Sequence, residues 1–428
     1  MIMELILKYF KQVTRINKNL ITPSILISIP IISLFIGFMF NEDLSTGGST
    51  WDFKVTWPII VDYSNFNFLD ADEFTRHMPL HYILLSYLNI IFDDPNVVRL
   101  IYLFFSLLLP IFLYLNLEKI YSYDKIHLLI FSFSFLFIPL FRAAAIWSNA
   151  HLTATIFFMI GNYFYLKSKE HHTYTYQLLN LLFLAFAIYS LQTYLILFLY
   201  YLYNYFLSEK ISKFIKILFF CFFLSLPGLY FILLNTRIAT QITITHDILY
   251  SLSTIFSIIF FFYLFLLFNK ENFKILIKII KKFRNIELFI LLFISILIFY
   301  NQSIFTYDSR LMGGGFFYKL SYFIFNNNLI FITSSILGLA LTYILIKYEP
   351  KILHIIIIIS LMSLNYAVYQ KYFEPLFLIM IGILFKNFLI GNILLNFKST
   401  LIFYVTIFFY FLIAHINLFK NLSYNLVG

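Results

Sequence analysis

Long apolar runs recur along the whole chain. Runs such as 128–140 and 248–268 contain almost no charge and do not alternate apolar with polar positions, so they predict helices rather than barrel strands. An α-helix needs about 20 apolar residues to cross a bilayer. The runs that reach or approach this length are 20–40, 97–117, 126–146, 150–166, 174–190, 192–207, 214–234, 248–268, 286–300, 328–346, 352–369, 375–391 and 400–418.

These runs predict an all-α polytopic membrane protein with about 11–13 transmembrane helices in a single integral membrane domain, residues 1–428. Composition supports this class, because 61% of residues are apolar and only 12% are charged, against about 25% in soluble domains. The first run, 20–40, lacks a small-residue cleavage site and is expected to remain as the first helix. The single cysteine, Cys221, permits no internal disulfide and no cysteine cluster for zinc.

The net charge of +10 orients the predicted helices. If the N-terminus is cytoplasmic, most of the 30 Lys and Arg residues fall on the inner side of the membrane and most of the 20 acids fall on the outer side. Inner connections of membrane proteins carry this excess of Lys and Arg. We therefore expect a protein of the plasma (inner) membrane that binds no nucleic acid. Its densest basic segment, 270–284, is expected to lie on anionic lipid.

The first outer loop, residues 41–96, is much longer than the other connections, and long loops in compact proteins tend to be functional. Residues 47–50 read as a turn or helix cap, and a short helix is predicted over 51–63. The stretch 80–92 is apolar but too short to span, so it is expected to lie along the membrane surface. The loop contains nine acids: Glu42, Asp43, Asp52, Asp62, Asp70, Asp72, Glu73, Asp93 and Asp94.

Carboxylates and cations thus meet on one predicted face at headgroup depth, which suits chemistry on a lipid-linked phosphate. In glycosyl transfer from a polyprenyl-phosphate sugar, a carboxylate acts as general base on the acceptor hydroxyl and basic groups stabilise the departing phosphate. Arginine is favoured over lysine for that phosphate because it binds two oxygens at once. The candidate bases are Asp52, Asp70, Asp72 and Glu73, and the candidate substrate or lipid-phosphate ligands are Arg76, His77, His81, Arg142, Arg310, Lys319, Lys371, Tyr372 and Glu374.

Each of these residues also has a plain structural interpretation. Acids in an exposed loop aid solvation, and Arg142 could extend its side chain to the membrane interface. His77 and His81 could bind a metal, but no third ligand follows at a firm spacing. No metal site and no cofactor are therefore predicted, although a divalent cation could assist the reaction.

Residues 1–170 resemble the GT-C superfamily of membrane glycosyltransferases, loosely in the manner of the protein mannosyltransferases and aminoarabinose transferases. The matching segments are 51–53, 76–82 and 92–100, and 372–375 is similar to a late motif of glucosyltransferases that use dolichyl-phosphate glucose. Two features depart from the family pattern. Met78 replaces one proline of a Pro-Pro pair, and the adjacent Asp-Glu pair of the family occurs at Asp72-Glu73 rather than at Asp52.

The resemblance implies a GT-C fold with an active site at the outer leaflet. The sequence thus favours a bacterial inner-membrane glycosyltransferase, which moves a sugar from a polyprenyl-phosphate donor to a cell-envelope polysaccharide, lipid or protein. A polymerase of O-antigen or capsule polysaccharide would use much the same residues and stays open as an alternative. A flippase or other transporter of lipid-linked oligosaccharides also stays open, although the paired, interrupted helices typical of transporters are not evident.

Overall fold

The computed structural model describes residues 21–45, 48–67, 77–234, 248–281, 284–304, 315–362, 370 and 373–427. The fold is all-helical, with 86% helix and no strand among the described residues. In chain order its helices are α2 (Ile21–Met39), α3 (Gly48–Ser64), α4 (Leu80–Phe92), α5 (Pro95–Ser106), α6 (Leu108–Ile120), α7 (Lys125–Ser134), η2 (Phe135–Phe137), α8 (Pro139–Ile146), α9 (Ala150–His171), α10 (Tyr174–Ser190), η3 (Gln192–Tyr194), α11 (Leu195–Ser208), α12 (Ile211–Leu234), α14 (Ile248–Leu267), α15 (Lys270–Ile280), α16 (Asn285–Ile304), α18 (Gly315–Phe325), α19 (Leu329–Tyr348), α20 (Ile352–Met362), α21 (Leu376–Ile383), α22 (Phe388–Leu394) and α23 (Phe397–Val427).

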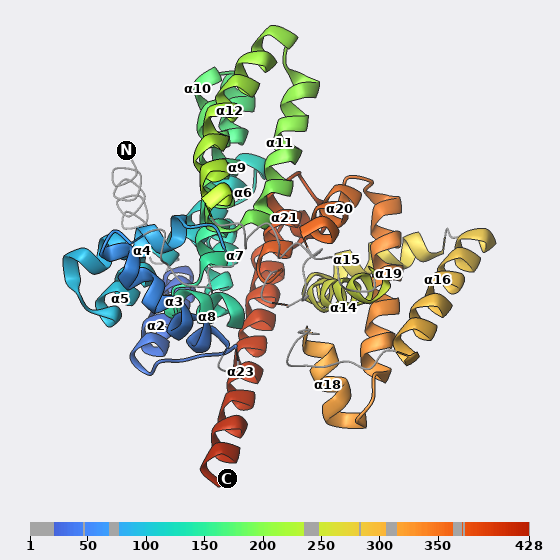
Figure 1. The fold of residues 1–428 in the computed structure, drawn as a ribbon. Helices are drawn as coiled ribbons and strands as arrows, with labels where there is room; N and C mark the ends of the chain where they lie inside the picture. The colour runs from blue at the N-terminus through green and yellow to red at the C-terminus, as the bar shows by residue number, and fades with distance from the viewer. Residues whose placement is uncertain are drawn as a thin grey trace.

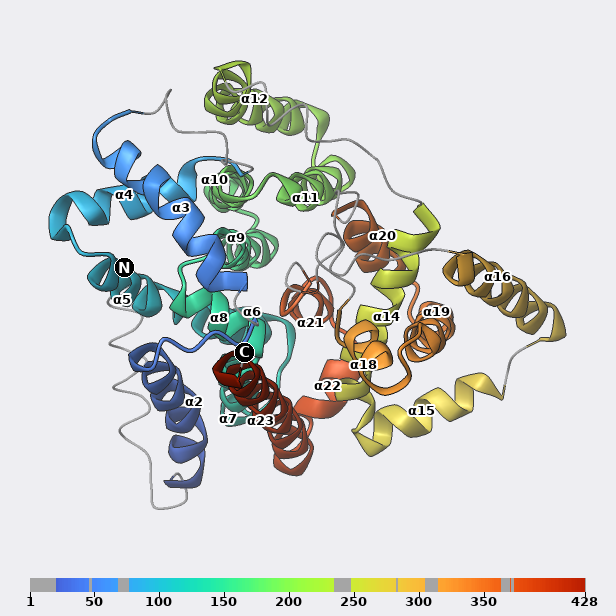
Figure 2. The ribbon, with the colours of Figure 1, turned by 60° about the horizontal axis from the view of Figure 1, so that its bottom comes forward.

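The helices form two groups on either side of the long C-terminal helix. Helices α2 to α12 lie on one side of α23, and α14 to α20 lie on the other (Figures 1 and 2). The most extensive packing between helices is that of α9 with α10 and of α14 with α19. Helix α23 also packs against α7 from the first group, so the last helix of the chain contacts one of the earliest.

Five helices of the described residues are long and apolar enough to cross a membrane, and up to eight spans result if each bent pair counts as one. The membrane class is thus supported, while the predicted 11–13 spans exceed what helix length alone supports. The difference arises because several apolar runs fold into helices shorter than a bilayer crossing. The run 192–207, for example, becomes η3 followed by the 14-residue α11.

Local chemistry explains where these apolar runs break. Helices α7 and α8 differ in direction by 70°, and Pro139 begins α8. A proline disfavours helical backbone in the residue before it, and Ile138 accordingly adopts an extended conformation with ψ of 121°. Helices α14 and α15 differ by 120°, and Asn269 caps the start of α15 through its side chain.

The 41–96 loop contains the two expected short helices. The first, α3, begins at Gly48 within the predicted cap and runs to Ser64, close to the predicted 51–63. The second, α4, covers 80–92 as predicted and packs against α3. Helix α4 buries one face and exposes large apolar side chains on the other: Leu84, Tyr87, Ile90, Ile91 and Phe92.

Candidate functional site

The carboxylate of Asp43 fixes the first turn of α3. Its Oδ2 accepts hydrogen bonds from the Thr50 backbone N–H at 2.8 Å and from the Thr50 hydroxyl at 2.7 Å. The Ser45 hydroxyl accepts from the Ser49 N–H at 2.7 Å. The first N–H groups of a helix have no partner within the helix, and these two side chains supply it. The start of α3, and with it Asp52, is thereby held in place.

Asn149 joins Asp52 to the start of α9. As the N-cap of α9, Asn149 accepts a hydrogen bond from the His151 backbone N–H at 3.0 Å, and its Nδ2 donates to Asp52 Oδ2 at 3.3 Å. The preceding residue, Ser148, has a left-handed backbone with φ of 50°, which turns the chain sharply between α8 and α9. The half-buried carboxylate of Asp52 therefore faces the α8–α9 junction.

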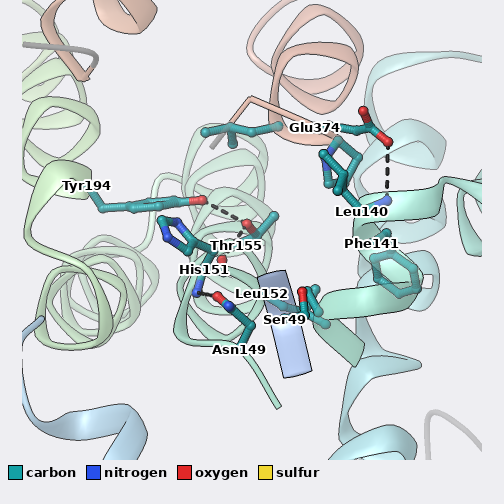
Figure 3. A pocket seen from close by; sticks show the side chains of 12 residues that line it. Ser49, Leu140, Phe141, Asn149, His151, Leu152, Thr155, Tyr194 and Glu374 are labelled. Carbon is teal, nitrogen blue, oxygen red and sulfur yellow. Dashed lines mark hydrogen bonds between the residues drawn. The ribbon is translucent and has the colours of Figure 1, made fainter. Parts of the chain in front are cut away.

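A small cavity lies beside this junction (Figure 3). Its walls come from α3, α8, the start of α9, η3 and the segment that precedes α21. A water molecule's centre can occupy about 20 Å³ of it, which is room for about one water. Two hydroxyls meet at its wall, where Thr155 Oγ1 and Tyr194 OH lie 2.8 Å apart. Its polar lining consists of Ser49, Asn149, His151, Thr155, Tyr194 and Glu374.

Glu374 lines the cavity on the side away from Asn149 (Figure 3). Its buried carboxylate accepts hydrogen bonds from the Leu140 N–H at 3.3 Å, from Gln370 Nε2 at 2.7 Å and from the Tyr410 hydroxyl at 3.0 Å. Burial disfavours the charged form more than these bonds favour it, and the pKa of Glu374 rises to about 7. Near neutral pH this carboxyl can therefore either donate or accept a proton.

The two predicted histidines differ in their surroundings. The ring of His77 meets the ring of His151 edge to face, with centroids 5.5 Å apart, so His77 lies close to the cavity. His81 is buried, and its Nε2 lies 2.9 Å from the Ser148 carbonyl while its Nδ1 lies 2.9 Å from Thr153 Oγ1. Because a carbonyl only accepts, Nε2 carries the proton. Burial lowers the pKa of His81 to about 3, so the ring is neutral and braces α4 against the start of α9.

The guanidinium of Arg142 is fully buried and forms a bidentate ion pair with Glu42, at 2.7 Å from Nε and 2.8 Å from Nη2. Its other contacts go to the Ser33 hydroxyl, the Ser33 carbonyl and the Leu136 carbonyl. All five N–H donors are thus engaged within the protein. His415 of α23 lies 3.2 Å from the same Glu42 carboxylate. In this arrangement Arg142 joins α2, α8 and α23, and none of its donors remains for a phosphate.

Lys319, another predicted phosphate ligand, lies on α18 with an exposed side chain and is not among the residues that line the cavity. The remaining predicted residues lie outside the described part of the chain: Asp70, Asp72, Glu73, Arg76, Arg310, Lys371 and Tyr372. Of the predicted set, Glu374 lines the cavity, whereas Asp52, His77 and His81 contact Asn149, His151 and Ser148 at the adjoining α8–α9 junction.

Sequence reasoning did not assign the residues that connect these groups. Asn149 and His151 belong to a short polar run between two apolar helices, a signal that could have marked a junction near the site. Tyr194 and Tyr410 are two of 33 tyrosines and carry no distinguishing signal in the sequence. Within the described ranges, no group of three or more His, Cys, Asp or Glu side chains is arranged to hold a metal ion. No protein-family model, curated protein or solved structure matches the chain.

Proposed function

We propose that the chain is a bacterial inner-membrane glycosyltransferase that moves a sugar from a polyprenyl-phosphate donor to a cell-envelope polysaccharide, lipid or protein at the outer leaflet. The observation that carries this proposal is the position of Asp52. Its half-buried carboxylate accepts a hydrogen bond from Asn149, and Asn149 lines the small cavity together with Glu374. The orientation of the protein, with a cytoplasmic N-terminus, rests on the distribution of Lys and Arg.

In the proposed reaction, Asp52 accepts the proton of the acceptor hydroxyl. The hydroxyl oxygen bonds to the anomeric carbon of the sugar as the bond from that carbon to the phosphate oxygen breaks, and polyprenyl phosphate leaves with the bonding electron pair. A cation must stabilise this phosphate. Because Arg142 is committed to Glu42, we assign that role to Arg76, Arg310 or Lys371.

An apolar groove beside Glu374 supports a lipid-linked donor. The groove runs between α14, α18 and α23, has a volume of about 570 Å³ and has an almost entirely apolar lining. Tyr410 forms part of this lining, and its hydroxyl donates to Glu374, which lines the polar cavity. The hydrogen-bonded side chains of Tyr410 and Glu374 therefore connect the apolar groove to the polar cavity. An amphiphile with a long hydrocarbon chain and a polar head matches this sequence of surfaces.

The test is complementation of a strain that lacks the gene, followed by mass spectrometry of its surface glycans. The Asp52→Asn variant should lose the product, since removing a general base typically lowers the rate by about 10²–10⁴-fold. Asp62→Asn is the matched control, because it makes the same change on the same helix and should retain activity. Equal membrane levels of the two variants exclude a loss of folding.

The glycans also separate the related activities. A transferase that adds a branch leaves long chains that lack one sugar when it is inactivated, whereas loss of a polymerase leaves single repeat units. Full activity in Asp52→Asn, Asp70→Asn and Asp72→Asn alike would contradict the proposed mechanism. Movement of an intact lipid-linked glycan across the membrane, without any new glycosidic bond, would indicate a transporter instead.

A further inference from the structure

Helix α15 is fixed rigidly at a sharp bend. It follows α14 at an angle of 120°, and Asn269 caps it by accepting hydrogen bonds from the backbone N–H groups of its first turn. Asn272 donates to the carbonyls of Leu266 and Leu389, and Asn392 of α22 donates to Asn272 at 2.9 Å. The buried amide of Asn272 thus ties α15 to both α14 and α22. The orientation of the helix is set by these bonds and by its packing.

The side chains of α15 fall into three stripes at helical spacing. One stripe faces the protein and is buried: Asn272, Leu276 and Ile279. A second stripe is apolar but exposed, at 51%, 40% and 44% of each residue's full accessible surface: Phe273, Ile277 and Ile280. The third consists of exposed lysines, the last of them just beyond the helix: Lys270, Lys274, Lys278 and Lys281.

The exposed apolar stripe lies between the lysine stripe and the buried stripe around α15. At about 100° per residue the lysine stripe adjoins the exposed apolar stripe, and the apolar stripe adjoins the buried one. Lys274 pairs with Glu271 at 2.7 Å, and both side chains are more than half exposed. Among the described residues, the other three lysines have no carboxylate within ion-pair distance. One face of α15 thus offers net positive charge directly beside hydrocarbon.

We propose that α15 binds the headgroups of anionic phospholipids, with its lysines at the phosphates and with Phe273, Ile277 and Ile280 among the upper acyl carbons. An amphipathic helix with basic residues on one side and apolar residues beside them lies at the boundary between headgroups and acyl chains. Each lysine close to an anionic membrane surface strengthens binding to that surface. A soluble acidic protein or a nucleic acid would neutralise the lysines but leave the apolar stripe in water. This inference does not depend on the proposed glycosyltransferase activity.

The test measures lipid binding to the full chain in detergent by native mass spectrometry, with phosphatidylglycerol and phosphatidylcholine as probes. The variant replaces all four lysines of the stripe with glutamine. A matched control replaces four exposed lysines elsewhere with glutamine: Lys210, Lys216, Lys351 and Lys398. We expect the wild-type protein and the control to bind phosphatidylglycerol alike, and the α15 variant to bind it at least about tenfold more weakly.

Two further measurements sharpen the result. Binding to the wild type should weaken as salt rises from 0.05 to about 0.5 M, because salt screens exposed charges. A Phe273→Gln and Ile280→Gln variant keeps every lysine and should also bind phosphatidylglycerol more weakly, which separates a lipid surface from a simple anion site. Equal losses in the α15 variant and the lysine control would overturn the proposal. Equal binding of phosphatidylglycerol and phosphatidylcholine would overturn it as well. So would displacement of phosphatidylglycerol by inorganic phosphate or RNA added at the same phosphate concentration as the lipid.

Discussion

The buried pair of Arg142 and Glu42 gives the sharpest test of the packing. Replacing Arg142 with Met removes five hydrogen bonds, two of them to the Glu42 carboxylate, and leaves this carboxylate buried with only the His415 side chain hydrogen-bonded to it. Removing one partner of a buried ion pair costs about 3–5 kcal/mol of unfolding free energy. The Glu42→Gln variant instead leaves the Arg142 guanidinium buried without a carboxylate partner, and its unfolding free energy should fall by a similar amount.

The double variant distinguishes this pair from two independent contacts. With both charges gone, no uncompensated charge remains, so the double variant should lose about as much as one single variant. The coupling free energy should therefore be at least about 2 kcal/mol. Reversible unfolding of the protein in mixed micelles, followed by circular dichroism as the fraction of denaturing detergent rises, measures all four proteins.

An exposed pair in the same protein is the control. Lys119 and Glu170 lie 2.6 Å apart with side chains 29% and 47% exposed, and pairs of this kind contribute less than about 1 kcal/mol. Their double-mutant cycle should show little coupling. If the losses for Arg142 and Glu42 simply add, or if their coupling is no larger than that of the exposed pair, the assignment of a buried, energetically dominant pair is refuted.

The ion pair of Arg142 and Glu42 also makes the unfolding free energy depend on pH. Burial by itself would raise the pKa of Glu42, but the hydrogen bonds from His415 and Arg142 outweigh burial and hold this pKa below its ordinary value of 4.5. A group with a lowered pKa stabilises the fold above its unfolded pKa, and this contribution disappears as pH falls through the folded value. The wild type should therefore lose more unfolding free energy than Glu42→Gln when the pH is lowered below about 4.5.

Two further substitutions test other contacts. Because burial raises the pKa of Glu374 to about 7, its carboxyl becomes destabilising as pH rises from about 4.5 to about 7; relative to wild type, Glu374→Gln should gain about 3 kcal/mol of unfolding free energy over that range, and a constant difference would contradict this. A Cβ at Gly338 would lie 2.0 Å from the Phe256 carbonyl oxygen, so Gly338→Ala should force α14 and α19 apart and lower the midpoint of micellar unfolding, at a cost of about 3 kcal/mol. Gly382→Ala, whose Cβ would meet its nearest neighbour at 3.6 Å, should leave that midpoint unchanged.

Much of the fold follows from local patterns in the sequence. Helix α4 occupies its predicted residues because an apolar run ends at Asp93-Asp94-Pro95, where Asp94 caps the next helix and Pro95 fits its first turn. Helix α3 begins within the predicted cap for the same kind of reason. The number of spans was harder to predict, because an apolar run shows that a segment avoids water but not where a helix bends within it. The break before Pro139 illustrates this.

The site depends on contacts that local patterns cannot reveal. Asn149 and Asp52 are 97 positions apart, and Leu140 and Glu374 are 234 positions apart, so no spacing in the sequence brings them together. The roles of Arg142 were also hidden. The sequence indicates that Arg142 lies near the end of a helix. Whether its guanidinium binds a phosphate or a carboxylate depends on the tertiary fold, which places Glu42, 100 positions away, against it.

The network around Glu42 has a consequence for how the protein is made. Glu42 follows the first described helix, whereas His415 belongs to α23, and 373 positions separate them. During synthesis the early helices enter the membrane well before α23 does. The pair between Glu42 and Arg142 can form at that stage, but its third member and the packing of Phe411 over the guanidinium, at 4.6 Å, arrive only with the last helix. The network around Glu42 is therefore complete only after α23 has been synthesised and packed.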